Sequence, residues 1–126
     1  MSSPNSILLV EDTESHAALV IKVLSYQGYN IHWENTGTKA IEYFKQNQAA
    51  LALIDIALPD ISGEELIEKL RNIQNQHVPM IAITAHSMKE TKGYLLDLGF
   101  DDYLSKPFSI QDLENKIKEY IPKNKF

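Results

Sequence analysis

The stretch that decides the fold is LALIDIALPD, residues 51–60. Its first four residues are apolar and run directly into Asp55, and Pro59, Asp60 and Gly63 mark a turn. An apolar run of this length that ends in turn residues predicts a strand buried on both faces. Asp55 is therefore expected at the carboxyl end of a central strand, the edge where open α/β sheets bind ligands. Because desolvating a carboxylate is costly, Asp55 needs a partner or a chemical task.

The length and composition predict one globular domain. The chain has 126 residues, of which 44% are hydrophobic and 23% are charged, as is ordinary for a protein with a single core. We expect the domain to span residues 6–121, with short flexible ends at residues 1–5 and 122–126.

The charge pattern and the missing residue types exclude several classes of site. The chain contains no cysteine, which excludes disulfides, thiolate zinc sites and cysteine nucleophiles. The net charge is −5 and the lysines near the C-terminus alternate with glutamates, so no nucleic-acid partner is expected. There is no apolar stretch that could span a bilayer and no signal peptide, which predicts a cytoplasmic protein without a membrane partner.

Strand-like and helix-like patterns alternate along the chain. Apolar or alternating segments predict five strands, at residues 6–10, 29–33, 51–55, 78–84 and 101–104. Helical spacing of apolar residues predicts five helices, over residues 13–27, 38–48, 62–73, 87–98 and 109–121. This alternation favours parallel strands joined by right-handed crossovers, with helices on both faces of the sheet. The fold class is therefore a doubly wound α/β fold.

Capping and breaking residues support the helix boundaries. Three serines are placed to cap helices, and for the first two a glutamate three residues later completes a capping box: Ser62, Ser87 and Ser109. Gly28 and Gly99 are expected to end helices. Gly93 lies inside the fourth helix and should weaken it by about 1 kcal/mol relative to alanine.

Five polar side chains end the predicted strands or come just after them, and they should meet at one edge of the sheet: Glu11, Asp12, Asp55, Thr84 and Lys106. Three neighbouring carboxylates repel one another unless a cation joins them. Because the ligands are all oxygen, that cation would be Mg²⁺ or Ca²⁺. Thr84 and Lys106 add a donor and a positive charge, which a phosphoryl group requires. A carboxylate can itself accept a phosphoryl group, so these residues predict an aspartyl-phosphate on Asp55.

These residues are similar to those of the receiver domain of two-component response regulators. The resemblance covers residues 6–121 and rests on motifs in the proper order: Glu11-Asp12, Asp55 within LIDIALP, Gly63, Thr84-Ala85 and Lys106-Pro107-Phe108. It implies a flavodoxin-like sheet of five parallel strands in the order 2-1-3-4-5, with five helices. A chemotaxis-type single-domain regulator and a receiver from a hybrid kinase would both fit.

The resemblance implies a set of metal ligands. Asp55 resembles the phosphoacceptor of the family. Asp12 and Asp55 would hold Mg²⁺ together with the backbone carbonyl of Ala57, and Glu11 would act mainly through metal-bound water.

The resemblance also implies a switch. Thr84 would bind the phosphoryl group and move toward it, and Lys106 would pair with a phosphoryl oxygen. The bond from Lys106 to Pro107 is expected to be cis. Tyr103 matches the aromatic residue that turns inward when Thr84 moves, and the helix weakened by Gly93 lies between the two.

The function implied is that of a phosphoacceptor in a phosphorelay, not of an enzyme that turns over a substrate. A histidine kinase or a histidine phosphotransfer protein would supply the phosphoryl group, docking near Ser15, His16 and Leu19. The phosphorylated face would bind a downstream protein target. The protein is expected to be a monomer or a weak homodimer.

Several alternatives compete with this reading. A phosphatase with an aspartyl-phosphate intermediate usually needs a second acid two residues after the nucleophile, where this chain has Ala57. A flavodoxin-like binding protein would need a polar, glycine-rich loop after the first strand, where Glu11 and Asp12 would repel a phosphate. A docking domain that is not phosphorylated is a further alternative.

Individual residues also have simpler roles available. Asp55 could cap a neighbouring helix, and Asp12 could cap the first one. His16 and His86 are expected to be surface histidines, although His86 lies where it could affect the lifetime of the phosphoryl group.

Overall fold

The computed structural model describes residues 4–85 and 89–121. Strands and helices alternate along these residues, as the sequence predicts. The strands are β1 (Ser6–Val10), β2 (Asn30–Glu34), β3 (Leu51–Asp55), β4 (Met80–Thr84) and β5 (Asp102–Ser105). The helices are α1 (Glu14–Tyr26), α2 (Gly37–Gln46), α3 (Gly63–Ile73), α4 (Lys89–Leu98) and α5 (Ile110–Tyr120).

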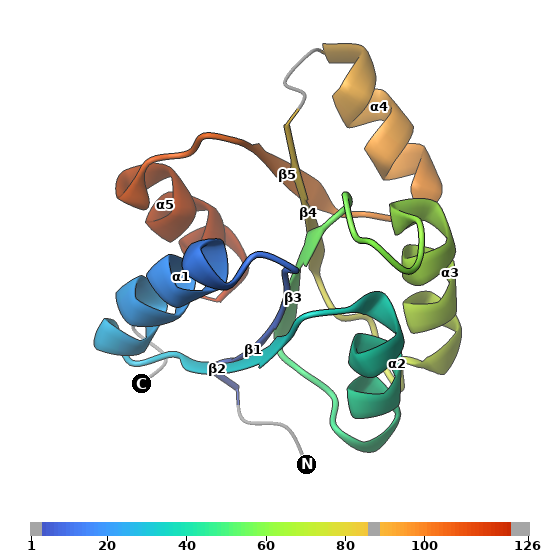
Figure 1. Ribbon diagram of the computed structural model, residues 1–126, viewed down its shortest axis with the longest axis horizontal. Helices are drawn as coiled ribbons and strands as arrows, with labels where there is room; N and C mark the ends of the chain where they lie inside the picture. The colour runs from blue at the N-terminus through green and yellow to red at the C-terminus, as the bar shows by residue number, and fades with distance from the viewer. Residues whose placement is uncertain (1–3, 86–88, 122–126) are drawn as a thin grey trace.

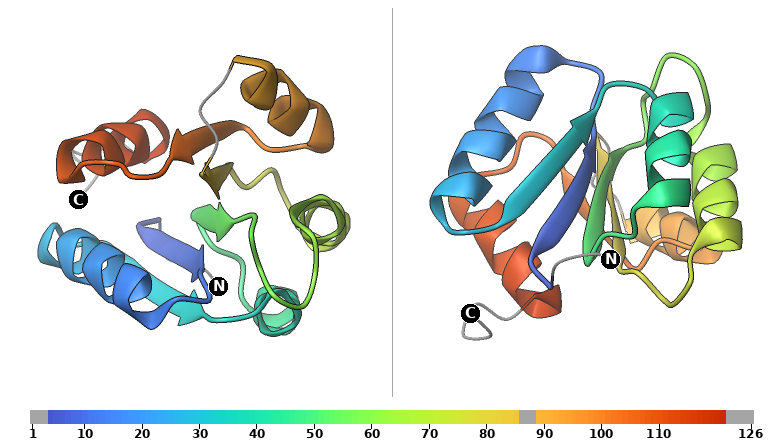
Figure 2. Two further views of the ribbon diagram at one scale, coloured as in Figure 1. Left: turned by 45° about the horizontal axis from the view of Figure 1, so that its top comes forward. Right: turned by 90° about the horizontal axis from the view of Figure 1, so that it is seen from below.

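The strands form one parallel sheet in the order β2-β1-β3-β4-β5. Helices α1 and α5 cover one face of the sheet, and α2, α3 and α4 cover the other (Figure 1). The two further views show the sheet between these layers, with β2 at one end and β5 at the other (Figure 2). The predicted fold class and strand order are therefore confirmed.

Strand β3 is buried on both faces, as the apolar run 51–54 predicts. Its side chains alternate between two cores. Leu51 and Leu53 pack in the cluster under α1 and α5, whereas Ala52 and Ile54 pack in the cluster under α2, α3 and α4. Because all five residues of β3 are buried, Asp55 ends a strand at the centre of the molecule.

Some boundaries differ from the prediction by one or two residues. Strand β4 begins at Met80 and not at Val78, since Pro79 has no amide hydrogen to donate to a neighbouring strand. Strand β5 is shifted by one residue and ends at Ser105, which pairs in register with Thr84. Helix α2 is shorter than predicted and starts earlier, because Thr36 caps it by accepting a hydrogen bond from the Lys39 amide.

The helix ends follow the predicted capping pattern where the structure describes them. Ser109 and Asp112 form a complete capping box at the start of α5. The Ser62 hydroxyl accepts from the Glu65 amide, which is half of the predicted box at α3. The predicted cap at Ser87 lies outside the described residues. Gly28 and Gly99 follow α1 and α4 with φ of 96° and 120°, a conformation that favours glycine at helix ends.

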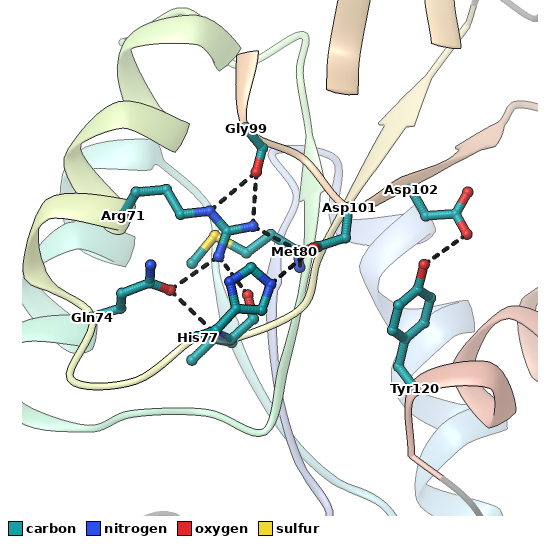
Figure 3. A network of polar contacts seen from close by, with 9 residues as sticks. Arg71, Gln74, His77, Met80, Gly99, Asp101, Asp102 and Tyr120 are labelled. Atoms are coloured by element: carbon teal, nitrogen blue, oxygen red, sulfur yellow. Dashed lines mark hydrogen bonds and ion pairs between the residues drawn. The ribbon is translucent and has the colours of Figure 1, made fainter. Parts of the chain in front are cut away.

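A hydrogen-bond network around Arg71, at the end of α3, lies at the edge of the sheet formed by the amino ends of the strands, called here the amino edge (Figure 3). Its guanidinium donates to the carbonyl of Gly99 at 2.7 and 3.0 Å and to the carbonyl of Val78 at 2.6 Å. It also lies 2.7 Å from Oδ2 of Asp101, and Nε2 of His77 lies 2.8 Å from the other oxygen of that carboxylate. Arg71 thus joins α3 to the segments that precede β4 and β5.

Among the described residues, no helix is both long enough and apolar enough to cross a membrane. The predicted domain limits, 6–121 with short ends, stay a prediction.

Candidate functional site

The strand ends bring the predicted acidic residues together. Val10 pairs in register with Ile54, so the residues that follow them, Glu11 and Asp55, lie at the same level of the sheet. Carboxylate oxygens of Glu11, Asp12 and Asp55 lie within 4.8 Å of one another. Glu11 and Asp55 are only 2% and 4% exposed, whereas Asp12 is exposed to solvent. The cluster therefore combines two buried carboxylates with one that solvent reaches.

Lys106 is the cation that faces this cluster. Its Nζ lies 2.8 Å from Oδ2 of Asp55 and 3.4 Å from Oε1 of Glu11. It follows β5 directly, and its peptide bond to Pro107 is cis, as expected. Burial lowers the pKa of Lys106, but the hydrogen bond and charge of Asp55 outweigh that effect and raise the pKa above its ordinary value. Lys106 is therefore held in its charged form.

The site carries more negative than positive charge, and this excess contributes to a raised pKa of Glu11. Burial raises the pKa of the Glu11 carboxyl, the amide of Thr13 lowers it, and the charge of Asp55 raises it again, so the pKa lies above its ordinary value. Three carboxylates face one ammonium group here. This excess of buried oxygen acceptors fits a hard divalent cation.

Asp55 uses both carboxylate oxygens inside this site. Oδ1 accepts a hydrogen bond from the amide of Ala57 at 2.8 Å, and Oδ2 pairs with Lys106. Neither described contact is to the first turn of a helix, so the alternative of a helix cap is wrong. The alternative cap for Asp12 is also wrong, because Thr13 is the N-cap of α1 and makes no side-chain capping bond. Ala57 is exposed beside Asp55.

Thr84 and Tyr103 lie on the next two strands. Thr84 is buried at the end of β4, and its carbonyl accepts from the Lys106 amide at 2.7 Å. Tyr103 is half-buried on β5 and packs against the core cluster under α2, α3 and α4. Gly93 lies within α4, between them in the chain, as predicted. His86 lies outside the described residues.

The structure also adds contacts that the sequence did not reveal. His16 is exposed, as predicted, but its Nδ1 lies 3.3 Å from Nζ of Lys106. Trp33, on β2, donates from Nε1 to the backbone carbonyl of Glu11 at 2.7 Å. This hydrogen bond joins β2 to the segment that carries Glu11 and Asp12. The position of His16 in the first turn of α1, just after the acidic pair, was the one signal for the first contact. Nothing in the sequence marked the second.

Comparison with known proteins identifies the family. A sequence model described as "Response regulator receiver domain" matches residues 7–118. The chain belongs to this family. It is 32% identical to the polar-differentiation response regulator DivK of Brucella anthropi, over 94% of this chain and 97% of that protein. It also matches three curated regulators at 33–38% identity, and it spans about half the length of each.

Solved structures of receivers superpose closely on this one. A CheY-like receiver domain protein from Methanospirillum hungatei has a TM-score of 0.86 and 31% identity, with 98% of each chain covered. The receiver domain of sensor histidine kinase PA1611 from Pseudomonas aeruginosa has a TM-score of 0.84 and 28% identity, covering 94% of this chain and 98% of that one. The latter structure has a magnesium ion coordinated in its active-site cleft.

Proposed function

We propose that Asp55 accepts a phosphoryl group from a phosphohistidine. An oxygen of the Asp55 carboxylate forms the new bond to phosphorus while the bond from phosphorus to the imidazole nitrogen breaks. The leaving imidazole keeps the electron pair and takes up a proton. The observation that carries this proposal is the pairing of buried Asp55 with Lys106 at 2.8 Å inside an acidic cluster. Membership of the receiver family supports the same chemistry.

We propose that the cluster holds Mg²⁺ for this reaction. Asp12 and Asp55 would bind it with the carbonyl of Ala57, and Glu11 would act through metal-bound water. The oxygen-only ligands and the raised pKa of Glu11 support this assignment. Bound Mg²⁺ supplies positive charge to the oxygens of the transferring group. The relative that holds magnesium in its cleft is a receiver too.

Lys106 and Thr84 would stabilise the phosphorylated form. Once Asp55 carries the phosphoryl group, the Lys106 ammonium can pair with a phosphoryl oxygen and Thr84 can donate its hydroxyl to another. Movement of Thr84 would leave space into which Tyr103 turns from the edge strand. This two-position arrangement would alter the face formed by α4, β5 and α5.

The phosphodonor would dock beside α1. A groove of about 370 Å³ lies next to Lys106, and its lining is mostly apolar: Glu11, His16, Leu19, Val20, Lys106, Pro107 and Phe108. Leu19 is 54% exposed at its rim, which is unusual for a leucine and supports contact with a protein. A histidine kinase or a histidine phosphotransfer protein is the partner that would bring phosphohistidine here.

Output would pass through protein contacts at the face of α4, β5 and α5. A second cavity of about 400 Å³ lies there, between residues such as Lys92, Tyr103 and Lys116. We propose a downstream protein as its partner, a cytoplasmic location, and a monomer or a weak homodimer. A phosphatase activity is not favoured, because exposed Ala57 stands where such an enzyme needs its second acid.

The test is phosphorylation by a small donor. The protein is incubated with acetyl phosphate and Mg²⁺, and intact mass is measured with and without a metal chelator. We expect one added phosphoryl group that depends on Mg²⁺ and is lost in Asp55→Asn. Labelling of Asp55→Asn equal to that of the unmodified protein, or no labelling of either, would contradict the proposal. Steady release of phosphate from a phosphomonoester would instead favour the phosphatase.

A further inference from the structure

The carboxylate of Asp60 hydrogen-bonds the loop that follows Asp55 to helix α2. Asp60, in the segment between β3 and α3, accepts hydrogen bonds from the amides of Gly37 and Thr38 at 3.0 and 2.9 Å. Its Oδ2 also accepts from the Thr38 hydroxyl at 2.6 Å. These bonds join residues 22 and 23 positions apart in the chain. Asp60 therefore caps a helix to which it does not belong.

Asp60 supplies a negative charge that the start of helix α2 otherwise lacks. Helix α2 contains no acidic residue in its own first turn, so Asp60 supplies the negative charge that helix N-termini favour. The hydrogen bond from Thr38 is the main cause that lowers the pKa of Asp60 below its ordinary value. Thr36 caps the same helix from within its own segment, through the Lys39 amide. The helix start is thus held by two capping side chains, and of these two Asp60 is the one that comes from the loop.

Close packing fixes the same loop at two points. A Cβ atom at Gly37 would lie 2.0 Å from Cγ2 of Ile61, so α2 meets the loop without room for a side chain. A Cβ atom at Gly63 would lie 2.9 Å from Cβ of Ile56, at the opposite end of the loop. Between these points lies Ala57, whose amide donates to Asp55. The loop has little freedom while both contacts and the Asp60 bonds are in place.

We propose that Asp60 is a positioning residue for the metal site, which sets the affinity for Mg²⁺ by holding the loop that carries the Ala57 carbonyl. This inference rests on the proposed function, because it assigns that carbonyl to the metal. The described hydrogen bonds of the Asp60 side chain go to Gly37 and Thr38 and to none of the three acidic residues of the cluster, so Asp60 would act through the backbone between residues 57 and 60. Residues that orient metal ligands commonly change metal affinity by about tenfold or more when they are replaced.

The matched experiment compares two caps of the same helix. Asp60→Ala removes the cap and the link to the loop, whereas Thr36→Ala removes a cap and leaves the link intact. Mg²⁺ binding is measured by calorimetry and by the fluorescence of Trp33, the only tryptophan, which contacts the Glu11 carbonyl. We expect Asp60→Ala to weaken Mg²⁺ binding by about 3- to 10-fold and Thr36→Ala by less than about 2-fold. Both variants should lower the melting temperature to a similar extent.

Two milder variants keep the test independent of folding. Thr38→Val removes one of the three bonds to Asp60, and we expect about a 2-fold weakening of Mg²⁺ binding. Asp60→Asn keeps an acceptor for the helix amides, and its affinity should fall between those of Asp60→Ala and the unmodified protein. Phosphorylation of Asp60→Ala by acetyl phosphate should be slow at low Mg²⁺ and recover at saturating Mg²⁺, since the phosphoacceptor itself is intact.

The outcomes separate this inference from the function on which it rests. If the unmodified protein binds Mg²⁺ and is phosphorylated, but Asp60→Ala and Thr36→Ala bind Mg²⁺ equally well, the inference is overturned and the function stands. If the unmodified protein neither binds Mg²⁺ nor is phosphorylated, both are overturned. A defect of Asp60→Ala that persists at saturating Mg²⁺ would also overturn the inference, because Asp60 would then act on a step other than metal binding.

Discussion

At the carboxyl edge of the sheet three carboxylates face one ammonium group, whereas at the amino edge the carboxylate of Asp101 is fully engaged. Asp101 accepts from Arg71, from His77 and from the Met80 amide at 2.7–2.8 Å (Figure 3). Burial would raise the pKa of Asp101, but these hydrogen bonds outweigh it and the pKa lies below its ordinary value. The pKa of Glu11 at the other edge is displaced upward.

This difference separates a polar network whose carboxylate is balanced by the protein's own donors from a cluster that is suited to bind a cation. A carboxylate whose donors are all supplied by the protein stabilises the fold and has no use for a ligand. A carboxylate cluster with too few positive partners costs stability until a cation or a modification balances it. We therefore expect the loss of a charged side chain to lower the free energy of unfolding at the amino edge, and the loss of an acidic charge to raise it at the carboxyl edge.

The largest effect is expected for Arg71→Ala. The guanidinium makes five hydrogen bonds in a half-buried position, and its loss would leave the Asp101 carboxylate and two carbonyls without their main donor. We expect the free energy of unfolding to fall by about 3 kcal/mol, measured by urea denaturation. Mg²⁺ affinity should not change, since this network lies at the opposite edge from the site.

The control for this variant lies on the same helix. Lys69 forms an exposed pair with Glu65 at 3.9 Å, and Lys69→Ala should change the free energy by less than about 0.5 kcal/mol. Equal destabilisation by the two substitutions would show that the closed network has no special structural weight.

Prediction from sequence was most successful where the chain encodes structure locally. The apolar run before Asp55 and the turn after it marked β3, and the alternation of patterns marked the parallel sheet. Parallel strands then require Glu11 and Lys106 to come to the same edge, and the structure brings them within 3.4 Å. The strand order itself came from the resemblance and not from any local pattern.

Contacts between distant side chains could not be predicted in this way. The bonds of Asp60 to α2, of Arg71 to Asp101 and of Trp33 to Glu11 depend on how loops and helices meet in space. Hydrophobic periodicity does not predict such contacts, because each partner taken alone is an ordinary polar or aromatic residue. Asp101, for example, fits the strand pattern as well as Asp102 does, and only the packed structure excludes it from β5.

Addition of Mg²⁺ should produce the next largest effect, and only at the carboxyl edge. At ten times its dissociation constant, Mg²⁺ should raise the free energy of unfolding by about 1.4 kcal/mol, because the proposed site would form in the folded state alone. For a domain of this size that corresponds to an increase in melting temperature of about 3–5 °C. Sodium chloride at the same ionic strength should not reproduce this increase, and Arg71→Ala should show it in full.

Removal of one acidic charge should have a smaller effect of the opposite sign to that of Arg71→Ala. Asp12 is exposed and its described contact is a weak one of 3.5 Å with Thr13, so Asp12→Asn mainly relieves repulsion within the cluster. Without metal, we expect the free energy of unfolding to rise by about 0.5 kcal/mol. Glu68→Gln, an exposed acid on α3, is the matched control and should leave stability unchanged. Destabilisation by Asp12→Asn would mean that the cluster is already balanced without a cation.

The smallest effect is expected in the pH dependence of the unmodified protein, where the two edges act with opposite signs in neighbouring pH ranges. The folded-state pKa of Glu11 is raised, so the folded state binds the extra proton, and stability increases as pH falls toward the ordinary value of 4.5. The folded-state pKa of Asp101 is lowered, so its contribution to stability is present above pH 3.8 and is lost as pH falls below that value.

The free energy of unfolding is measured against pH with the metal chelated. Glu11→Gln should remove the gain in stability above pH 4.5, and Asp101→Asn should reduce the loss below pH 3.8, of which the lowered pKa values of Asp60 and Asp102 supply the remainder. If both substitutions changed the slope of stability against pH in the same direction, the contrast between the two edges would be wrong. That contrast requires the pKa values of Glu11 and Asp101 to be displaced in opposite directions on folding.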